Sequence, residues 1–412
     1  MFENSKIIAG LEIGSSKICI VIGELNAAGG LNIIGVGQAP SHGVRKGEII
    51  NPKQVAEDLQ TAVSEAEQMA DVEIRSVFLG VSGGHIRGFN NHGVHPVVSE
   101  NHEIFQEDVD DVVKNAKAIN LPAENTVIHT VRQHFCVDGQ GGVTDPVGML
   151  GARLEVDMHV IHGHANRLQN AVRLVLATRM KVDDVVFNGL AASLALLTTE
   201  QKELGALVID MGAGTTEYVA YSDGVIRHSG VLAVGGDHVT NDLAFGLKIS
   251  LRRAEKMKIA HGSALVTEAA KGQTISITND LGLELKRVKA EHLQIIMSLR
   301  LEEVFELIAR EMEEAGLTDY LRAGVFLCGG GSRVPGLGGL AEKVFQMNVT
   351  TGQAPAISGL ATALNQPEFT TAIGLVKYGA LMHQKTPPPV SFLTRIMQLV
   401  GKMVSFIKEL FD

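Results

Sequence analysis

Two stretches of this chain, half a protein apart, are built alike. The first runs from Gly10 to Ile20 and the second from Leu207 to Val219. Each is an apolar strand ending in a carboxylate, then a glycine turn with small hydroxyl side chains, then a second apolar strand. Glycine lets backbone N–H groups close on an anion, hydroxyls add donors, and a carboxylate can hold a metal ion through water. One such hairpin would be weak evidence, because glycine turns between strands are common. Two of them predict a duplicated fold that grips one polyphosphate from both sides.

A third glycine-rich segment supports this prediction. An apolar strand at residues 325–328 runs into Gly329, Gly330, Gly331 and Ser332 before a helix. Such a turn permits close backbone approach to a ligand, and the start of the following helix favours negative charge. The chain has no Gly-Lys-Ser/Thr signature of a P-loop and no clean Gly-x-Gly-x-x-Gly after its first strand. The P-loop and dinucleotide-binding classes are therefore disfavoured.

Composition narrows the class of partner. The 412 residues allow two or three domains. The net charge is −10 and no basic run appears, so we expect no nucleic-acid partner. The three cysteines share no metal or redox spacing, which indicates a reduced cytoplasm. The first residues lead straight into a strand and no apolar run is long enough to span a bilayer, so we expect neither a signal peptide nor a transmembrane helix.

Alternating strand and helix patterns predict α/β layers. Strands are expected at 7–13, 18–24, 31–37 and 75–81, with a helix from about Pro52. The interval 84–163 is richer in histidine and glycine and is typical of a small inserted α+β module. From Ser250, a good helix cap, the chain is expected to be mainly helical, with a long amphipathic helix at 289–316. Three prolines after Thr386 predict a short stiff spacer.

These motifs resemble those of the actin-like ATPase superfamily and, within it, the FtsA family of bacterial cell-division proteins. The residues that carry the family resemblance are Asn32-Ile-Ile-Gly-Val-Gly, Lys46-Gly47-Glu48-Ile, Asp145-Pro146-Val-Gly148-Met, Gly189-Leu-Ala-Ala-Ser193, Gly235-Gly236-Asp-His-Val-Thr240-Asn-Asp242 and Ala254-Glu255-Lys-Met-Lys258. The resemblance covers about Lys6 to Gly379 plus the C-terminal helix. It implies an α/β, duplicated (ribonuclease H-like), two-lobed ATPase fold.

The resemblance also implies a domain division. The first lobe would comprise 1–83, 164–190 and 356–384, and the interval 84–163 would be the subdomain that the family carries instead of the one in actin. The core of the second lobe would comprise 191–246 and 317–355, and its helical subdomain 247–316. A linker at 385–389 and an amphipathic membrane-targeting helix at 390–412 would follow.

By the same resemblance the chain would bind ATP and Mg²⁺. Asp210 and Glu12 would hold the metal through water, although the superfamily usually has Asp where this chain has Glu12, and the extra methylene moves the carboxylate. The residues implied to contact the nucleotide are Gly14, Ser15, Ser16, Lys17, Gly212, Gly214, Thr215, Thr216, Gly236, Glu255, Lys258, Gly330, Gly331 and Ser332.

No catalytic residue is expected. The segment 187–192 offers no acid at the place where related chaperones and actin-like filament proteins carry a Glu or Gln that orients the attacking water. Fast hydrolysis needs such a positioning group. We therefore expect at most a slow ATPase, in which bound ATP is mainly structural or regulatory.

The implied function is a filament-forming adaptor at the cytoplasmic face of the cell membrane, at the division site. It would tether polymers of the tubulin-like protein FtsZ and help to recruit later division proteins. The FtsZ C-terminal peptide would dock on the helical subdomain, where Arg300 best matches the family's contact position. The alternative is that Arg300 only pairs with Glu302 or Glu303. Self-association would use the interval 84–163.

Two other classes of function are alternatives, a component of pilus assembly and an enzyme. The actin-like cytoplasmic component of type IV pilus assembly also carries an inserted module, but it lacks a C-terminal amphipathic helix. A sugar kinase would need a catalytic base that the sequence does not offer. A chaperone-type ATPase would need a substrate domain, and only about thirty residues follow the core.

The last residues show helical spacing with one apolar and one polar face. The apolar face comprises Phe392, Leu393, Ile396, Met397, Val400, Met403, Val404, Phe406, Ile407, Leu410 and Phe411. Placing Arg395 or Lys402 at mid-bilayer would cost roughly 2.5–3.5 kcal/mol each, so the pattern favours a helix that lies in the lipid interface. The alternatives are a helix packed on the protein's own core and a coiled-coil partner helix.

Overall fold

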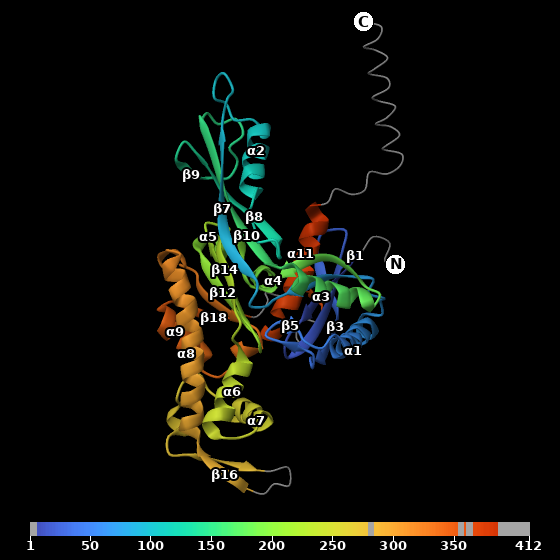
Figure 1. Cartoon of the computed structure of the whole chain (residues 1–412), viewed down its shortest axis with the longest axis vertical. Coiled ribbons are helices and arrows are strands. Elements are labelled where there is room, and N and C mark those ends of the chain that lie inside the picture. Colours follow the sequence, from blue (N-terminus) through green and yellow to red (C-terminus); the bar gives the residue numbers. More distant parts are fainter. Residues whose placement is uncertain (1–5, 279–283, 353–357, 360–365, 386–412) are drawn as a thin grey trace.

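The structure is a computed structural model that describes residues 6–278, 284–352, 358–359 and 366–385. Two β-sheets that carry the glycine hairpins lie in the middle of the molecule (Figure 1). A smaller α/β module projects from one end, and helices with a short β-hairpin form the other end. The mixed α/β class predicted from the sequence is confirmed.

The first lobe is built on a six-stranded sheet in the order β11-β6-β1-β2-β3-β19. Its strands are β1 (Lys6–Ile13), β2 (Lys17–Leu25), β3 (Leu31–Pro40), β6 (Ser76–Val81), β11 (Lys181–Phe187) and β19 (Ser358–Gly359). The first three form the predicted antiparallel meander, and β6 runs parallel to β1. A two-residue ladder, β4 (Val44–Arg45) with β5 (Glu48–Ile49), lies between β3 and the first helix.

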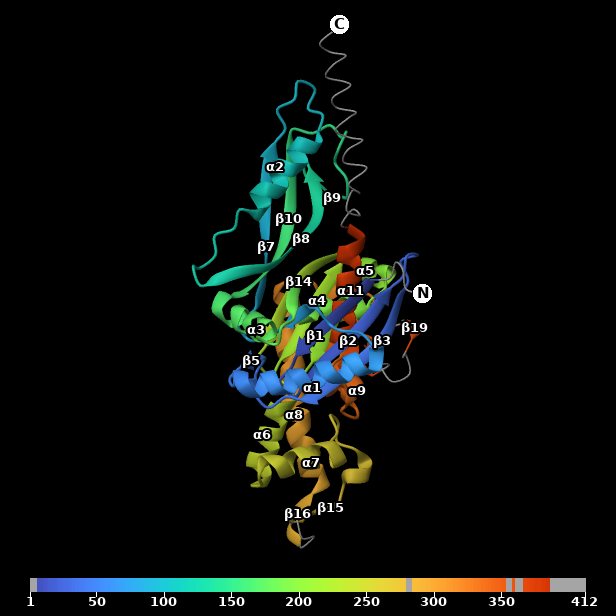
Figure 2. The ribbon, with the colours of Figure 1, turned by 90° about the vertical axis from the view of Figure 1, so that its right-hand side faces the viewer.

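Helices cover both faces of this sheet. They are α1 (Pro52–Ala70), α3 (Ala165–Ala177), α4 (Asn188–Leu196) and α11 (Thr370–Lys385). Figure 2 shows one of them, α1, lying across the strands of the sheet. The side chain of Asn51 caps α1 by accepting the N–H of Gln54. Gly37 packs on the backbone of α1 and Gly10 on that of α11, so closely that a Cβ at either position would lie inside 3.0 Å of helix backbone atoms. The glycines therefore set how closely the helices approach the sheet.

The second lobe repeats this plan in a five-stranded sheet with the order β14-β13-β12-β17-β18. Its elements are β12 (Ala206–Met211), β13 (Thr216–Ser222), β14 (Val225–Leu232), β17 (Gly324–Cys328), β18 (Val349–Thr351), α5 (Thr199–Leu204) and α9 (Leu337–Phe345). β12 pairs antiparallel with β13 across the glycine turn and parallel with β17, as β1 pairs with β2 and β6. The duplication predicted from the two hairpins is confirmed.

The module at one end has its own sheet and its own apolar core. It consists of β7 (Arg87–Pro96), α2 (Gln106–Lys117), β8 (Asn125–Val137), β9 (Gln140–Val143) and β10 (Arg153–His164). A buried polar network joins it to the second lobe: the fully buried His159 ring contacts Asn90 Oδ1 and Ser229 Oγ, each at 2.7 Å. Gln133 Nε2 donates to the Ile226 carbonyl at 2.7 Å. Directional contacts of this kind fix the module against β14.

The helical end contains α6 (Gly236–Leu247), α7 (Leu251–His261) and α8 (Ala290–Glu314). The prediction of a mainly helical segment was incomplete, because β15 (Thr274–Thr278) and β16 (Glu284–Lys289) form an antiparallel hairpin there. The Thr-Ile-Ser-Ile-Thr run of β15 alternates with period two and is rich in β-branched residues, which favours a strand. Ser250 precedes α7 as predicted, but its side chain makes no capping hydrogen bond.

None of the helices in the described part of the chain combines the length and apolar character that crossing a bilayer requires. The predicted C-terminal amphipathic helix, 390–412, lies outside the described residues.

Candidate functional site

The two glycine turns face each other where the lobes meet. In each turn the first glycine donates its N–H to a carbonyl three residues on, Gly14 to Lys17 and Gly212 to Thr215, both at 2.9 Å. A Cβ on Gly214 would lie inside 3.0 Å of Ser15 Oγ, so the second turn touches the first and only glycine fits. The structure thus brings together the two turns that the sequence predicts to share one polyphosphate.

The other predicted nucleotide contacts line the second lobe beside its turn. Gly236 begins α6 and donates its N–H to the Gly212 carbonyl at 3.0 Å. Lys258 Nζ contacts Glu255 Oε2 at 2.7 Å and donates to the Gly236 carbonyl at 3.1 Å. A positive end of α6 and a lysine therefore lie within reach of an anion held by the turn.

The third glycine segment closes on the carboxylate of the second hairpin. Gly329 has φ of +79°, in the left-handed region, and a Cβ there would overlap Asp210 Oδ1. Gly330 begins a short 3-10 turn, Gly330–Arg333, and Ser332 Oγ donates to the Gly329 carbonyl at 2.7 Å. The structure places this segment next to Asp210, as a shared ligand site requires.

Three carboxylates gather between the lobes: Glu12, Asp210 and Glu217. The pKa of Glu12 is raised to about 7, because burial and, to a smaller extent, the charge of Asp210 outweigh the opposing effect of Lys17. Burial also raises the pKa of Asp210, although the hydroxyl of Thr371 donates to Asp210 Oδ2. Such shifts mark groups that lack a full counter-charge.

In the described part of the chain no group of three or more Asp, Glu, His or Cys side chains is placed to hold a metal ion, but Glu12 and Asp210 fit a Mg²⁺ that is held through water. Glu12 Oε2 is a buried acceptor without a hydrogen-bond partner among the described residues, and hard cations prefer carboxylate and water oxygens. A cation among the three carboxylates would favour their ionised forms. Asp210 and Glu12 are thus the residues that could hold Mg²⁺ through water.

Lys17, a predicted phosphate contact, lies at the same site but is engaged. Its ammonium donates to the Glu368 carbonyl and lies 4.2 Å from the centre of the Phe369 ring. Glu368 in turn pairs with Arg333 at 2.6 Å. Lys17 would have to exchange the carbonyl for a phosphate oxygen on ligand binding.

Sequence reasoning missed Glu217, Ser82 and Thr371. Glu217 lies directly opposite Asp210 in the antiparallel register of β12 and β13. Its burial, followed by the negative charge of Asp210, raises its pKa to about 8. Strand alternation after the glycine turn was the signal that could have found it, because paired positions share a face. Nothing local indicates Ser82. Thr371 begins a segment, 371–379, that resembles a motif of the actin-like superfamily, but the sequence does not indicate its contact with the distant Asp210.

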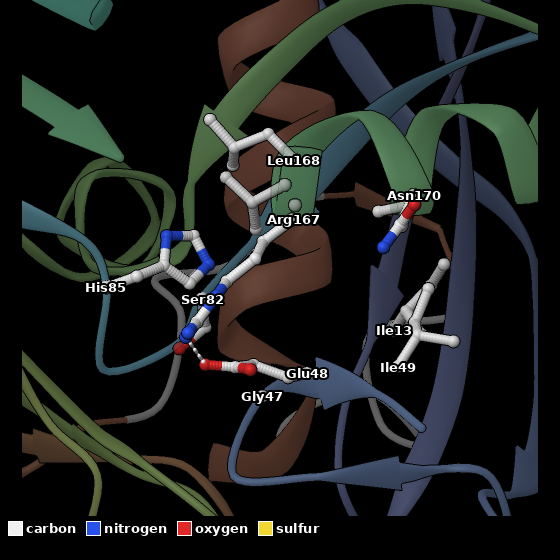
Figure 3. Close-up of a pocket in the computed structure, with 12 residues that line it drawn as sticks. Ile13, Gly47, Glu48, Ile49, Ser82, His85, Arg167, Leu168 and Asn170 are labelled. Atoms are coloured by element: carbon white, nitrogen blue, oxygen red, sulfur yellow. Dashed lines mark hydrogen bonds and ion pairs between the residues drawn. The ribbon is translucent and has the colours of Figure 1, made fainter. Parts of the chain in front are cut away.

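A cavity of about 80 Å³ adjoins the first glycine turn (Figure 3). Glu48, Ser82, His85 and Arg167 point into it, and Arg167 forms an ion pair with Glu48. Burial and the charge of Arg167 lower the pKa of His85 to about 4. The cavity is too small for a nucleotide, so it lies beside the candidate site and does not form it.

Arg300, the predicted partner contact, is paired within the chain. Its Nε donates to Asp242 Oδ2 at 2.6 Å and Nη2 to Asp242 Oδ1 at 3.2 Å. A second ion pair joins it to Glu303 on its own helix. The Glu303 alternative stated from the sequence is thus present, and Asp242 on α6 is a further partner.

Comparisons with known proteins agree with this architecture. The family model "Cell division protein FtsA" matches residues 207–374, and the model "SHS2 domain inserted in FTSA" matches 83–162. The cell division protein FtsA of Pseudomonas aeruginosa is 36% identical over 377 residues, which covers 92% of this chain and 90% of the relative. This chain belongs to the FtsA family. The FtsA of Escherichia coli strain K12 is 35% identical over 412 residues, which covers 98% of this chain and 96% of the relative.

Solved structures show that this FtsA-family chain has an actin-like fold. The PilM-PilN type IV pilus biogenesis complex matches with a TM-score of 0.65 at 17% identity, covering 90% of this chain and 98% of the other. MreB5 of Spiroplasma citri bound to ADP matches with a TM-score of 0.52 at 14% identity, covering 92% and 99%. At these identities the similarity concerns the fold alone.

Proposed function

We propose that this FtsA-family protein binds ATP·Mg²⁺ and links filaments of FtsZ to the cytoplasmic face of the cell membrane at the division site. The observation that carries the proposal is the meeting of two glycine turns over buried carboxylates from both lobes. A ligand bound there contacts both lobes at once, so its binding free energy favours one relative position of the lobes. This arrangement suits nucleotide-regulated assembly.

Each predicted residue would have a distinct part in binding. Backbone N–H groups and hydroxyls of Ser15, Ser16, Thr215 and Thr216 would hold the β- and γ-phosphates between the turns. The segment from Gly330 to Ser332 would contact the adenosine. Mg²⁺ would neutralise phosphate charge. Turnover would be slow, because the segment that contains Asn188 supplies no acid.

Asp210→Ala tests nucleotide binding. The variant removes the carboxylate that both lobes approach, so Mg²⁺-dependent ATP affinity is expected to fall at least tenfold, or about 1.4 kcal/mol. Titration of a fluorescent ATP analogue with and without Mg²⁺ measures it. Asp319→Ala, an exposed carboxylate on the short turn Thr318–Tyr320, is the control and should bind as wild type. A wild-type protein that binds no ATP at micromolar concentrations would refute the proposal.

The helical subdomain offers a surface for the FtsZ C-terminal peptide. A groove of about 730 Å³ runs between α6, α7 and β16, and Phe245 at its edge is 88% exposed. Lys248, Arg253 and Lys286 also line it. Exposed apolar side chains beside cations suit a short peptide with apolar anchors and carboxylates. Arg300 lies one helical turn from Ile296, which packs on Gly246 of the same groove.

Two substitutions test this docking surface. Phe245→Ser should weaken the FtsZ peptide at least fivefold, because it removes an exposed apolar anchor worth roughly 1–2 kcal/mol. Arg300→Glu should also weaken binding, by repelling peptide carboxylates. Fluorescence anisotropy of a labelled peptide gives both affinities. Tyr320→Ser, at an aromatic residue 52% exposed outside this groove, is the matched control. Unchanged affinity in both variants would move the docking site elsewhere.

Self-association through the module would complete the adaptor. Its outer end exposes apolar side chains, among them Val98 (84%) and Leu150 (69%), which suit a contact with a second copy. A head-to-tail contact between unlike surfaces is open-ended and gives filaments. The C-terminal amphipathic segment would attach each copy to lipid, and later division proteins would join the assembled filament.

A further inference from the structure

Glu217 is a buried carboxylate that reaches across the cleft. It is 3% exposed and extends from β13 on the face that also carries Asp210. Its Oε1 accepts a hydrogen bond from Ser82 Oγ, which follows β6 in the first lobe. The same hydroxyl lies 3.2 Å from Thr215 Oγ1 in the second glycine turn. Glu217 therefore lies beside the predicted γ-phosphate contacts and between the two lobes.

Asn188 supplies an independent observation at the same place. It is 6% exposed, and its Oδ1 is a buried acceptor without a hydrogen-bond partner in the described part of the chain. This oxygen points at Gly80, where a Cβ would overlap it. Gly80 and Ser82, which directly follows the end of β6, line the same small cavity, so Asn188 Oδ1 and the Ser82 hydroxyl lie in the same region of the first lobe.

Gly189, the residue after Asn188, packs against β13, the strand that carries Glu217. A Cβ on Gly189 would lie 3.0 Å from Val219 Cγ2, and Val219 is two residues beyond Glu217 on the same face of β13. One acceptor without a partner and one buried carboxylate thus line the same part of the cleft. A water molecule donates two hydrogen bonds, and two fixed acceptors determine its orientation.

We propose that Glu217 orients the water that attacks the γ-phosphate of ATP, with Asn188 Oδ1 as the second acceptor. The inference rests on the proposed ATP binding and adds the acidic positioning group that the segment 187–192, which contains Asn188, does not provide. The water oxygen bonds to the γ-phosphorus as the bond from that phosphorus to the β–γ bridging oxygen breaks. The electron pair leaves with ADP, and the proton of the water passes to an oxygen of the released phosphate.

Glu217→Gln is the first test. The amide keeps the size of the side chain but presents an N–H₂ group where the water needs an acceptor, so single-turnover hydrolysis should fall at least about tenfold. The ATP dissociation constant should stay within about threefold, because ground-state contacts persist. Ser82→Ala, which frees Glu217 from the hydroxyl that holds it, should lower the rate by a smaller factor with the same affinity.

A binding measurement supplies a readout without turnover. ADP with aluminium fluoride imitates the in-line phosphoryl group and its water, so Glu217→Gln should weaken its binding at least about tenfold relative to ADP alone. Glu311→Gln is the matched control. Tyr218 follows Glu217 in β13 and lies on the other face of that strand, where its hydroxyl donates to the Glu311 carboxylate. The hydrolysis rate and the aluminium fluoride affinity of Glu311→Gln should therefore match those of wild type.

ATP binding and the role of Glu217 can fail separately. Failure of the wild-type protein to bind ATP would refute the proposed function. Intact ATP binding with unchanged hydrolysis and unchanged aluminium fluoride affinity in Glu217→Gln would refute the role of Glu217 alone. Equal losses in Glu217→Gln and Glu311→Gln would also refute it, because they would indicate a general effect on β13.

Discussion

Gly374→Val is expected to lower the melting temperature of the first lobe by roughly 6–12 °C. Gly374 lies in α11 where that helix crosses α4. A Cβ there would lie well inside 3.0 Å of the Ala191 carbonyl oxygen and carbon. These are backbone atoms of a packed helix, so they can give way only if the two helices separate. Overpacking of this kind costs about 3 kcal/mol, which exceeds the gain in helix propensity of under 1 kcal/mol.

A matched control isolates the helix contact from the change of residue. Gly338→Val makes the same substitution in α9, where a Cβ would meet nothing within 4 Å. Its melting temperature should stay close to that of wild type, within about 0.5 kcal/mol of stability. Differential scanning calorimetry of both variants gives the comparison. Equal melting temperatures for the two variants would show that α11 and α4 can separate at little cost.

The same helix contact bears on the candidate site. α4 begins at Asn188, and α11 begins at Thr370 beside Thr371, whose hydroxyl donates to Asp210. Both ends therefore lie at the cleft between the lobes. A shift of α11 against α4 would move two cleft residues at once. We expect Gly374→Val to weaken ATP binding as well as stability.

Local patterns in the sequence were sufficient for the elements that carry the site. Each glycine hairpin is a contiguous stretch in which apolar alternation, a carboxylate and a turn follow one another. The amphipathic period likewise predicted α8 to within two residues at each end. Short-range signals of this kind depend on neighbouring residues alone.

Contacts between the lobes could not be predicted in the same way. Ser82 bonds Glu217 across 135 residues, and Thr371 bonds Asp210 across 161. Each depends on how two separately folded units pack, which a single sequence does not encode locally. The β15–β16 hairpin was missed for a different reason. It is short and carries charged residues in β16, so its period-two signal is weak beside the flanking helices.

The second large effect is expected at the membrane. Ile396→Glu combined with Phe406→Glu should release the protein from liposomes. The helical spacing of 390–412 predicts one apolar face, and both substitutions fall on it. Burying an Ile or Phe side chain contributes roughly 1.5–3 kcal/mol, so the pair removes about 3–6 kcal/mol and lowers partitioning more than a hundredfold. Co-pelleting with vesicles of neutral and of anionic lipid measures the fraction of protein that remains bound.

Gln398→Glu with Ser405→Glu is the matched control, because it adds the same two charges on the predicted polar face. Arg395, Lys402 and Lys408 nearly balance the acidic groups of this segment, so apolar burial should dominate and the loss should persist at high salt. One such helix would attach reversibly, and filament assembly would add avidity. Because apolar burial dominates, the control with both charges on the polar face should bind vesicles as wild type does. Retention of the apolar-face variant at every salt concentration would instead place the membrane contact outside this helix, and equal release of both variants would indicate an electrostatic attachment.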